Sequence, residues 1–458
     1  MVRDAGGRQM VLVAFLQAQN CSNYPASWRH EETAADFLTA AYYQRIARTL
    51  EAGRFHLAFF DDRLAMPDRY GDDFAETVRH GIRAVKLDLV PLITAMGLAT
   101  RHLGVGGTYS TTYHEPFHVA RVFATLDHLL GGRAAWNVVT SLNDSEAANF
   151  GKVTHPEHDA RYDRADEFME AVLGHWDSWE DDAIRYDRSD GVFADPAKVH
   201  RLDHAGAAFR SRGPFTVPRT PQGRPVIIQA GQSGRGRRFA ARWAELIFAI
   251  YPSREGAQRA YREIKDAVAR AGREPSRVWL MPAVYCVVGE TKAEAEEKAA
   301  YIRSLAQPMD TLVLLSEALN YDFATKGMDE PFSDAELASI SGLQALRDRV
   351  VRASGTAHPT LRDFIEHSGR GTLREFPCFV GTVADVADQL EEWFTSEACD
   401  GFVLSATHMP GTYEDFVRLV VPELQRRGLF QREYRGTTLR ENLGLPRAER
   451  HDWGGREG

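Results

Sequence analysis

Eight short runs of mostly apolar residues recur along the 458-residue chain, and most are followed by a segment with helical periodicity. Each run is nearly continuous in apolar residues, as expected for parallel strands that are buried on both faces. Strands that alternate with helices build either an open doubly wound sheet or a closed barrel. Because eight strands over this length favour closure, we predict a (β/α)8 TIM barrel of the α/β class. The runs are Met10–Leu16, Phe55–Phe60, Leu103–Tyr109, Ala134–Thr140, Pro225–Ala230, Glu245–Ile250, Val278–Val288 and Gly401–Ser405.

Long stretches near residues 181–223 and 310–376 interrupt this alternation, and we read them as insertions into a single domain that spans residues 1–458. In barrels, insertions after strands tend to build the site at the C-terminal face. A C-terminal extension begins at about residue 430, and its polar part from Arg435 is expected to wrap a surface or fray. Helices are predicted at Phe37–Ala52, Pro116–Leu130, Arg161–Trp179, Lys292–Leu305, Thr382–Phe394 and Glu414–Arg427.

Composition argues against several classes of protein. The formal net charge is -9, so the chain has no basic excess with which to neutralise nucleic-acid phosphates. Its four cysteines are far apart and form no CxxC pair, which argues against a disulfide scaffold or a thiolate metal site and favours the cytoplasm. No apolar run reaches the roughly 18–20 residues that span a bilayer, so no membrane partner is expected.

A zinc-protease spelling, H-E-x-x-H, occurs at residues 114–118. The zinc chemistry needs both histidines one turn apart on a helix. Pro116 lies between them and is expected to begin the helix, which leaves His114 in the preceding loop. We therefore predict no metal site here and interpret the segment as a strand-to-helix loop at the barrel mouth.

The segment from Ala230 to Gly236 reads AGQSGRG and lies between an apolar run and a helix expected from about Arg237. Glycines let the backbone approach a ligand, and free N–H groups at a helix start favour an anion. Ser233 would add a hydroxyl donor and Arg235 a positive charge. The pattern indicates a phosphate site, and the alternative is a glycine-rich turn without a ligand.

Polar residues at other strand ends are further candidates. Asn137 lies within a buried strand, where its amide needs a partner, either a heterocyclic ligand or a neighbouring loop. Asp61 and Asp62 end an apolar run, a place typical of active-site carboxylates and, more commonly, of helix caps. His158 and Tyr162 are four residues apart, so they share one helix face and could bind one ligand or form a surface pair.

Read together, several segments resemble one family, the nitrilotriacetate monooxygenase, pristinamycin synthase and dibenzothiophene sulfone monooxygenase group of the bacterial luciferase-like flavin monooxygenases. The resemblance covers about residues 9–445 and is most specific in the combination of WNVVTS with a downstream EHDARY. The segments are FFDD (59–62), TTYHEPFHVAR (111–121), FATLDHL (123–129), GRAAWNVVTS (132–141), NFG (149–151), EHDARY (157–162), PQG (221–223), QAG (229–231), VPELQRRG (421–428) and TLR (438–440).

The resemblance implies an FMN-binding barrel, usually a homodimer or homotetramer. Reduced FMN would come from a separate NAD(P)H:flavin reductase, and the oxygenase would use O2 to oxygenate a small organic substrate, often with cleavage of a C–N or C–S bond. It also implies a place for each FMN ligand. Asp62 would contact the ribityl chain or ring, Thr108 and Asn137 the ring, His158 and Tyr162 the ribityl chain and phosphate, and Ala230, Gly231, Gln232 and Ser233 the phosphate.

Three residues, Tyr113, His114 and His408, are candidates for proton transfer or substrate contact. One departure from the family concerns the segment from Gln17 to Tyr24, which lacks the histidine that sulfone monooxygenases of this group carry after the first strand. This departure favours a different heteroatom or a carbonyl substrate over a sulfone. Two rival functions stay open, namely a deazaflavin-dependent oxidoreductase of the same superfamily and a barrel that binds flavin without catalysis.

Overall fold

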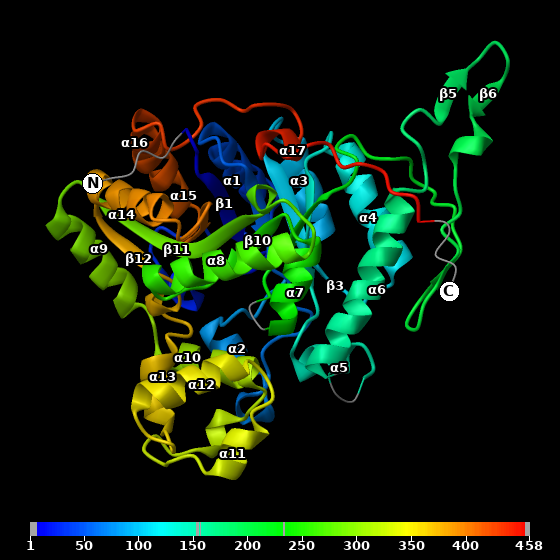
Figure 1. The fold of residues 1–458 in the computed structure, drawn as a ribbon. Helices are drawn as coiled ribbons and strands as arrows, with labels where there is room; N and C mark the ends of the chain where they lie inside the picture. Colours follow the sequence, from blue (N-terminus) through cyan, green and yellow to red (C-terminus); the bar gives the residue numbers. More distant parts are fainter. Residues whose placement is uncertain (1–6, 153–154, 156, 232–233, 454–458) are drawn as a thin grey trace.

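The computed structural model describes residues 7–152, 155, 157–231 and 234–453. Eight parallel strands close into a barrel in the order β1-β2-β3-β4-β9-β10-β11-β13, and β13 pairs back onto β1 (Figure 1). Each predicted apolar run overlaps one barrel strand, and β3 and β11 extend one residue beyond their runs, so the predicted TIM barrel is confirmed. The strands are β1 (Val11–Leu16), β2 (Leu57–Phe60), β3 (Gly104–Ser110), β4 (Ala134–Val139), β9 (Val226–Gln229), β10 (Leu246–Ala249), β11 (Trp279–Gly289) and β13 (Gly401–Ser405).

Side chains alternate between the two faces of each barrel strand, as the two-residue period of a strand requires. In β1, Val11, Val13 and Phe15 belong to the apolar cluster inside the barrel, whereas the residues between them belong to the cluster under the helices. Phe15 lies 5.0 Å from Phe59 and 5.2 Å from Phe248, measured between ring centroids. The interior is therefore filled by side chains, and a ligand site has to lie at an end of the barrel.

The helices that surround the barrel agree with the six predicted ones, with ends that differ by a few residues. Thr382 caps the helix that follows it through the predicted box, because its hydroxyl accepts from Asp385 N and the Asp385 carboxylate accepts from Thr382 N. The helices are α1 (Ala40–Ala52), α3 (Leu89–Leu98), α4 (Pro116–Leu129), α6 (His158–Trp176), α7 (Gly234–Trp243), α8 (Arg254–Arg270), α9 (Lys292–Ser304), α14 (Val383–Thr395), and α15 (Gly411–Asp415) joined through a π-helical turn, η7 (Phe416–Val420), to α16 (Val421–Arg426). None of the helices in the described ranges is both long and apolar enough to cross a membrane.

The C-terminal extension plugs the N-terminal end of the barrel, so the expectation of a surface wrap or a frayed tail was wrong for this part. Helix α17 (Leu439–Asn442) places Leu439 in the apolar cluster of the barrel interior, together with Leu443 and Leu445. The contact is close, because a Cβ on Gly104, the first residue of β3, would come within 2.6 Å of the Leu439 side chain. The leucines are interspersed with charged and polar residues, which hides this packing in the sequence.

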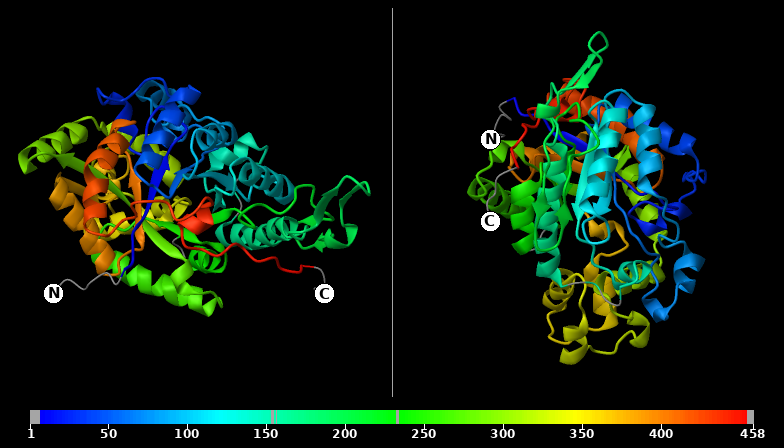
Figure 2. Two further views of the ribbon diagram at one scale, coloured as in Figure 1. Left: turned by 90° about the horizontal axis from the view of Figure 1, so that it is seen from above. Right: turned by 90° about the vertical axis from the view of Figure 1, so that its right-hand side faces the viewer.

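The stretch between α6 and β9 forms two antiparallel hairpins. The first, β5 (Ile184–Asp187) with β6 (Val192–Ala194), projects from the body beside the outer ends of α4 and α6 (Figures 1 and 2). The second consists of β7 (His204–Ala205) and β8 (Arg210–Ser211).

The stretch between β11 and β13 forms a helical lobe, which consists of α10 (Pro308–Leu319), α11 (Asp334–Ser339), α12 (Gln344–Ser354) and α13 (Leu361–Ser368). The lobe has its own apolar cluster, and it lies at the same end of the barrel as α2 (Ala75–His80) and α5 (Asp144–Asn149) (Figures 1 and 2). Those two helices follow the C-terminal ends of β2 and β4. A bidentate ion pair of 2.7 and 2.9 Å joins Arg29, in the loop after β1, to Asp310 of α10.

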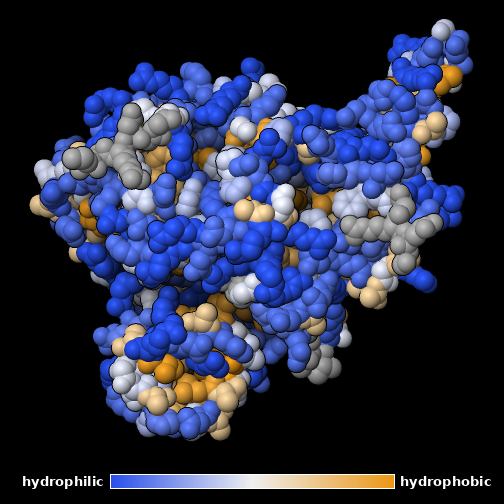
Figure 3. All heavy atoms as spheres, viewed as in Figure 1, coloured by the Kyte–Doolittle hydropathy of each residue, from blue (hydrophilic) through white to orange (hydrophobic). Residues whose placement is uncertain are grey.

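Apolar side chains also gather on the outer face of this lobe (Figure 3). Met328 and Leu343 are among the exposed apolar residues of the segment. A strand that the apolar pattern did not predict, β12 (Cys378–Thr382), follows the lobe and pairs with the second half of β11, outside the closed barrel. The lobe and β12 thus extend one side of the barrel beyond the predicted eight strands.

Candidate active site

Thr108 and Asn137 form a fixed polar pair near the C-terminal ends of the neighbouring strands β3 and β4, where they are register partners. The Thr108 hydroxyl donates to Phe60 O (2.7 Å), so its oxygen accepts from Asn137 Nδ2 (2.8 Å). This network orients the amide and leaves Asn137 Oδ1 buried without a partner. Because a buried acceptor without a donor is costly, Asn137 Oδ1 is set up to receive an N–H or O–H group of a ligand.

Two neighbouring carboxyl groups after β2 have opposite protonation behaviour. Burial alone would raise the pKa of Asp61, but Lys86, at 2.6 Å, together with nearby Arg83 and Arg63 holds it below its ordinary value. Burial raises the pKa of Asp62 to about 7, although Lys86 opposes the shift. Asp61 is therefore a stable anion, whereas Asp62 holds a proton for part of the time at neutral pH.

Tyr113 and His114, two candidates for proton transfer or substrate contact, lie side by side after β3, and both contact the ring of Phe150. His114 Nδ1 lies 3.0 Å from Ser110 O, so it donates, and the neutral ring keeps Nε2 as an acceptor. Burial lowers the pKa of His114 and raises that of Tyr113. The pair therefore offers a neutral imidazole and a protonated phenol at one place.

A histidine and an arginine that were not predicted fix the direction of the Tyr113 hydroxyl. Arg161 donates to His155 Nε2 (2.8 Å), so the proton of the neutral imidazole is on Nδ1, 2.7 Å from Tyr113 Oη. Burial and the nearby Arg161 charge lower the pKa of His155 to about 4, which keeps the ring neutral. The Tyr113 oxygen thus accepts from His155, and its own proton remains available to a ligand.

Helix α4 begins at Pro116, with Glu115 as its N-cap. His114 is therefore in the preceding loop, as predicted, and it cannot share a helix face with His118. The H-E-x-x-H spelling does not have the geometry of a zinc site.

The described residues that were predicted to bind the phosphate lie near the junction of α6 and α7. The ring of Tyr162 lies between those of His158 (5.1 Å) and Phe239 (5.5 Å), and Gly231 N donates to Gln229 Oε1 (2.5 Å). Gln232 and Ser233 lie outside the described residues, and Ala230 is the residue before Gly231 at the end of β9.

One expectation at this junction needs correction. Arg235 was expected to add charge to a phosphate, but its guanidinium lies 2.9 Å from Asp163 and 2.5 Å from Asp166. These carboxylates of α6 neutralise the guanidinium, so it ties α7 to α6. Helix α7 itself begins at Gly234, so the start of a helix still follows the predicted phosphate loop.

His408 has a different neighbourhood from the other predicted proton-transfer residues. Its ring stacks on His30 at 4.0 Å, and its Nε2 lies 3.3 Å from Glu32. It lines a cavity of about 210 Å³ together with Cys286 and Tyr301, and none of the predicted FMN ligands lines that cavity. The structure brings Tyr113 and His114 together and leaves His408 apart from them.

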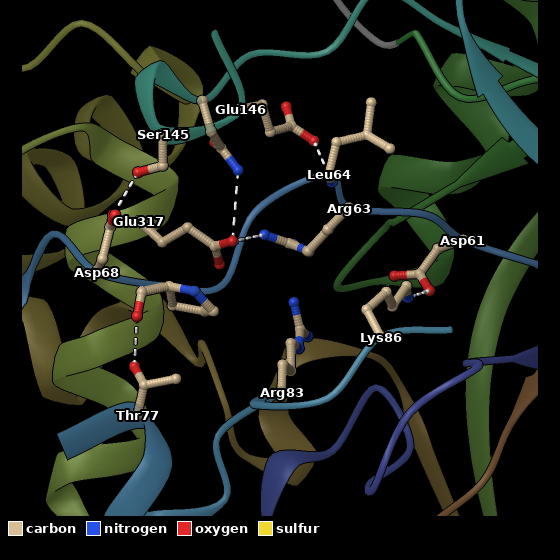
Figure 4. A network of polar contacts seen from close by, with 12 residues as sticks. Asp61, Arg63, Leu64, Asp68, Thr77, Arg83, Lys86, Ser145, Glu146 and Glu317 are labelled. Atoms are coloured by element: carbon tan, nitrogen blue, oxygen red, sulfur yellow. Dashed lines mark hydrogen bonds and ion pairs between the residues drawn. The ribbon is translucent and has the colours of Figure 1, made fainter. Parts of the chain in front are cut away.

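A network of charges that the sequence analysis did not predict lies at the same end of the barrel (Figure 4). Arg63, in the loop after β2, forms an ion pair with Glu317 of α10, and Glu146 of α5 accepts from Leu64 N (3.1 Å). Arg83 lies beside this pair with its guanidinium buried. A signal was present in the sequence, because Glu317 is the one acid in the apolar run LVLLSEAL of α10.

Comparison with known proteins decides the family. The model of the luciferase-like monooxygenase family matches residues 19–398, most of the chain. The chain belongs to the luciferase-like monooxygenase family. A relative named dibenzothiophene-sulfone monooxygenase, from Rhodococcus erythropolis, is 48% identical over 96% of this chain and 97% of its own length.

Two further similar proteins indicate to which group of luciferase-like monooxygenases this chain belongs. Nitrilotriacetate monooxygenase component A from Aminobacter aminovorans is 38% identical and covers 93% of both chains. A crystal structure of a riboflavin lyase with modified FMN and the substrate riboflavin has a TM-score of 0.87, with 33% identity and 96% coverage of both chains. The predicted group of monooxygenases is thereby confirmed, and the protein is a flavin-dependent monooxygenase.

The deazaflavin-dependent enzymes, which represent one of the two rival functions, are only distantly similar to this chain. An F420-dependent secondary alcohol dehydrogenase superposes with a TM-score of 0.55 at 13% identity. That level of identity shows a shared fold and nothing about the cofactor.

Proposed function

We propose that this luciferase-like monooxygenase is the oxygenase component of a two-component system. It would take up reduced FMN from a separate NAD(P)H:flavin reductase at the C-terminal end of the barrel and oxygenate a small organic substrate. The chemistry with O2 would be supplied by bound reduced FMN. The chain's own residues would bind the flavin, orient it and shield it. The name of the relative from Aminobacter, component A, and the modified FMN in the riboflavin lyase structure support this proposal.

The observation that carries the proposal is the buried, partnerless Oδ1 of Asn137. The pyrimidine edge of a flavin carries an N–H group between two carbonyl groups, and such a donor satisfies this acceptor. The Thr108 hydroxyl uses its only proton on Phe60 O and accepts from Asn137 Nδ2, so its part is to hold the amide in the orientation that presents Oδ1. Asp62 lies in the loop that follows β2, the strand next to β3, and would be within reach of the same ligand's ring or ribityl chain.

On the phosphate side, the proposal assigns His158, Tyr162 and the loop from Ala230 to Ser233. The N-terminus of α7 attracts an anion, and the side chain of Tyr162 closes one wall beside it. Since Arg235 is neutralised by two carboxylates, the phosphate would be bound mainly by backbone N–H groups and by hydroxyl and imidazole donors.

Near the substrate, Tyr113 and His114 would handle protons. The tautomer of His155 leaves the Tyr113 proton free to be donated, and His114 Nε2 is free to accept one. A neutral donor and a neutral acceptor side by side suit general acid–base catalysis near neutral pH. His408 would contact substrate or transfer protons at a second cavity, which it lines together with Cys286 and Tyr301.

The finer statements about partners rest on the same family membership. We propose a transient reductase partner, a homodimer or homotetramer, and a cytoplasmic location, in keeping with four cysteines that are all free thiols. Dibenzothiophene sulfone and nitrilotriacetate, which the names of the two relatives give as their substrates, are the first compounds to assay.

The test combines the purified chain with an FMN reductase, NADH, FMN and labelled 18O2, and it follows substrate oxygenation and hydrogen peroxide. Oxygen from O2 in the product, lost when the reductase is omitted, would support the proposal. Turnover without O2 when reduced deazaflavin replaces reduced FMN would favour the hydride-transfer rival. Tight binding of oxidised FMN with no turnover of any substrate would favour a flavin-binding barrel without catalysis.

A further inference from the structure

Building on the proposed function, we infer that Arg83 is the substrate-binding residue of this site and that it selects substrates with an exposed carboxylate or sulfonyl oxygen. Arg83 lies after α2, in the segment that leads into α3, near Asp61 of the loop after β2 (Figure 4). Most of the N–H donors of the Arg83 guanidinium have no acceptor among the described residues.

The hydrogen bonds of Arg83 are incomplete. The residue is 4% exposed, and Nη2 donates to Asn23 O and Asn23 Oδ1, both at 3.0 Å. Nε and Nη1 are buried without a partner among the described residues, so three of the five guanidinium N–H bonds are unused there. Buried donors of a charged group are costly to leave unpaired, which indicates that a ligand completes them.

The charge of Arg83 is also uncompensated. Its neighbours are already paired with each other: Arg63 with Glu317, Lys86 with Asp61, and Arg370 with Glu375. Within the described residues, no carboxylate comes within ion-pair distance of Arg83. Burial, together with the like charges of Arg63 and Arg370, lowers the pKa of Arg83 to about 10, which still leaves it a cation at neutral pH.

The backbone holds Arg83 in place. Its φ is 56°, a left-handed conformation that costs energy in a residue with a side chain. Asn20 stabilises the turn from both sides, because its amide donates to Gly81 O (2.7 Å) and accepts from Val85 N (3.3 Å). A strained conformation that its surroundings enforce is typical of a side chain that is oriented before its ligand arrives.

The fork of N–H bonds in Arg83 matches two oxygens on one atom, as in a carboxylate or a sulfonyl group. Figure 4 shows the guanidinium directed toward the space between the Arg63–Glu317 and Lys86–Asp61 pairs. Asp61, which forms an ion pair with Lys86, directly precedes Asp62 in the sequence. Asp62 is one of the proposed flavin ligands. A substrate oxygen on Arg83 would therefore hold the rest of the substrate close to the flavin.

The test measures dissociation constants for the FMN-loaded protein by calorimetry, with matched probes. One pair is dibenzothiophene sulfone and dibenzothiophene, and the other is nitrilotriacetate and triethylamine. Wild-type protein should prefer the oxygen-bearing member of at least one pair, and Arg83→Met should weaken its binding by about 10- to 100-fold. Arg83→Lys separates the two chemistries, because a point charge rescues carboxylate binding in part and sulfonyl binding hardly at all.

A matched control is Arg273→Met, at the other end of the barrel beside Glu245, which should leave all four constants unchanged. Unchanged FMN affinity in Arg83→Met would show that the fold survives. The inference is overturned if wild-type protein has no preference within either pair, or if Arg83→Met keeps that preference. Oxygenation assays are read separately: a preference that depends on Arg83, without oxygenation of any substrate, would contradict the proposed function and leave the binding site standing.

Discussion

The ion pair between Arg63 and Glu317 connects the helical lobe to the loop after β2, and breaking it should loosen the lobe from the barrel mouth. Three variants test this connection: Arg63→Met, Glu317→Leu and the double variant. Only 5% of the Glu317 side chain and 20% of the Arg63 side chain are exposed to solvent. Burial by itself lowers the pKa of Arg63, but Glu317 and other acids raise it above its ordinary value, so the pair stabilises the charged arginine.

Each single change removes one partner of a buried ion pair, which typically costs about 3–5 kcal/mol where the remaining charge finds no other partner. Replacing both partners by apolar residues of similar size is often close to neutral. We therefore expect Glu317→Leu to lose about 3 kcal/mol of unfolding free energy, and Arg63→Met to lose less than that because Glu317 can turn to Arg83. The double variant should lose less than the sum of the two by at least about 2 kcal/mol. Part of this loss should appear as local opening of the lobe.

The assay is urea unfolding, with limited proteolysis of residues 320–360 as the readout for the lobe. The control pair is Arg362 and Asp329 on the same lobe, an exposed pair whose removal should show no measurable coupling. Single costs that add up in the double variant, to within about 0.5 kcal/mol, would refute the argument that this pair couples lobe and barrel.

Three further outcomes follow from the site and the core. Asn137→Ala should weaken FMN binding by about 3- to 10-fold, the value of one hydrogen bond, with an unchanged melting temperature; unaltered affinity would remove Asn137 from the flavin site. The pKa of Asp62 is raised to about 7, so its ionisation destabilises the fold as pH rises, and the melting temperature of Asp62→Asn should rise relative to that of wild type between about pH 4 and 7. Asp61→Asn, whose parent carboxyl has a lowered pKa, should show no such gain, and parallel profiles for both would contradict the assignment. Leu439→Ala should cost about 2–5 kcal/mol of unfolding free energy, whereas Leu98→Ala at a 67% exposed position should cost little; equal losses would exclude α17 as a plug.

The barrel was predictable because its strands are buried on both faces, which leaves continuous apolar runs in the sequence. The same signal fails for β12, where only Phe379 and Gly381 are buried and Cys378, Val380 and Thr382 are half-buried. It also fails for α17, because Leu439 is buried beside charged residues that find their own partners. Arg440, for example, lies 2.5 Å from Glu245.

In the candidate site, the residues of the proposed flavin half could be picked out because they follow or end barrel strands. Parallel strands of a barrel end at one face, so Asp62, Thr108 and Asn137 had to come near each other once the strands were placed. The proposed substrate half has no such constraint. Arg29 and Asp310 are 281 residues apart in sequence, and only the docking of the lobe brings such partners together.

The two arginines at the mouth depend on each other through Glu317. Oε1 of Glu317 is bound by Arg63, while its Oε2 is buried without a partner near Arg83. If Arg63 is replaced by Met, the carboxylate is free to turn to Arg83 and neutralise it. Arg63→Met should therefore abolish the preference for oxygen-bearing probes, although Arg83 is intact, and the double variant Arg63→Met/Glu317→Leu should regain it. Retention of that preference in Arg63→Met would show that Glu317 cannot reach Arg83, and that the unpaired state of Arg83 does not depend on Arg63.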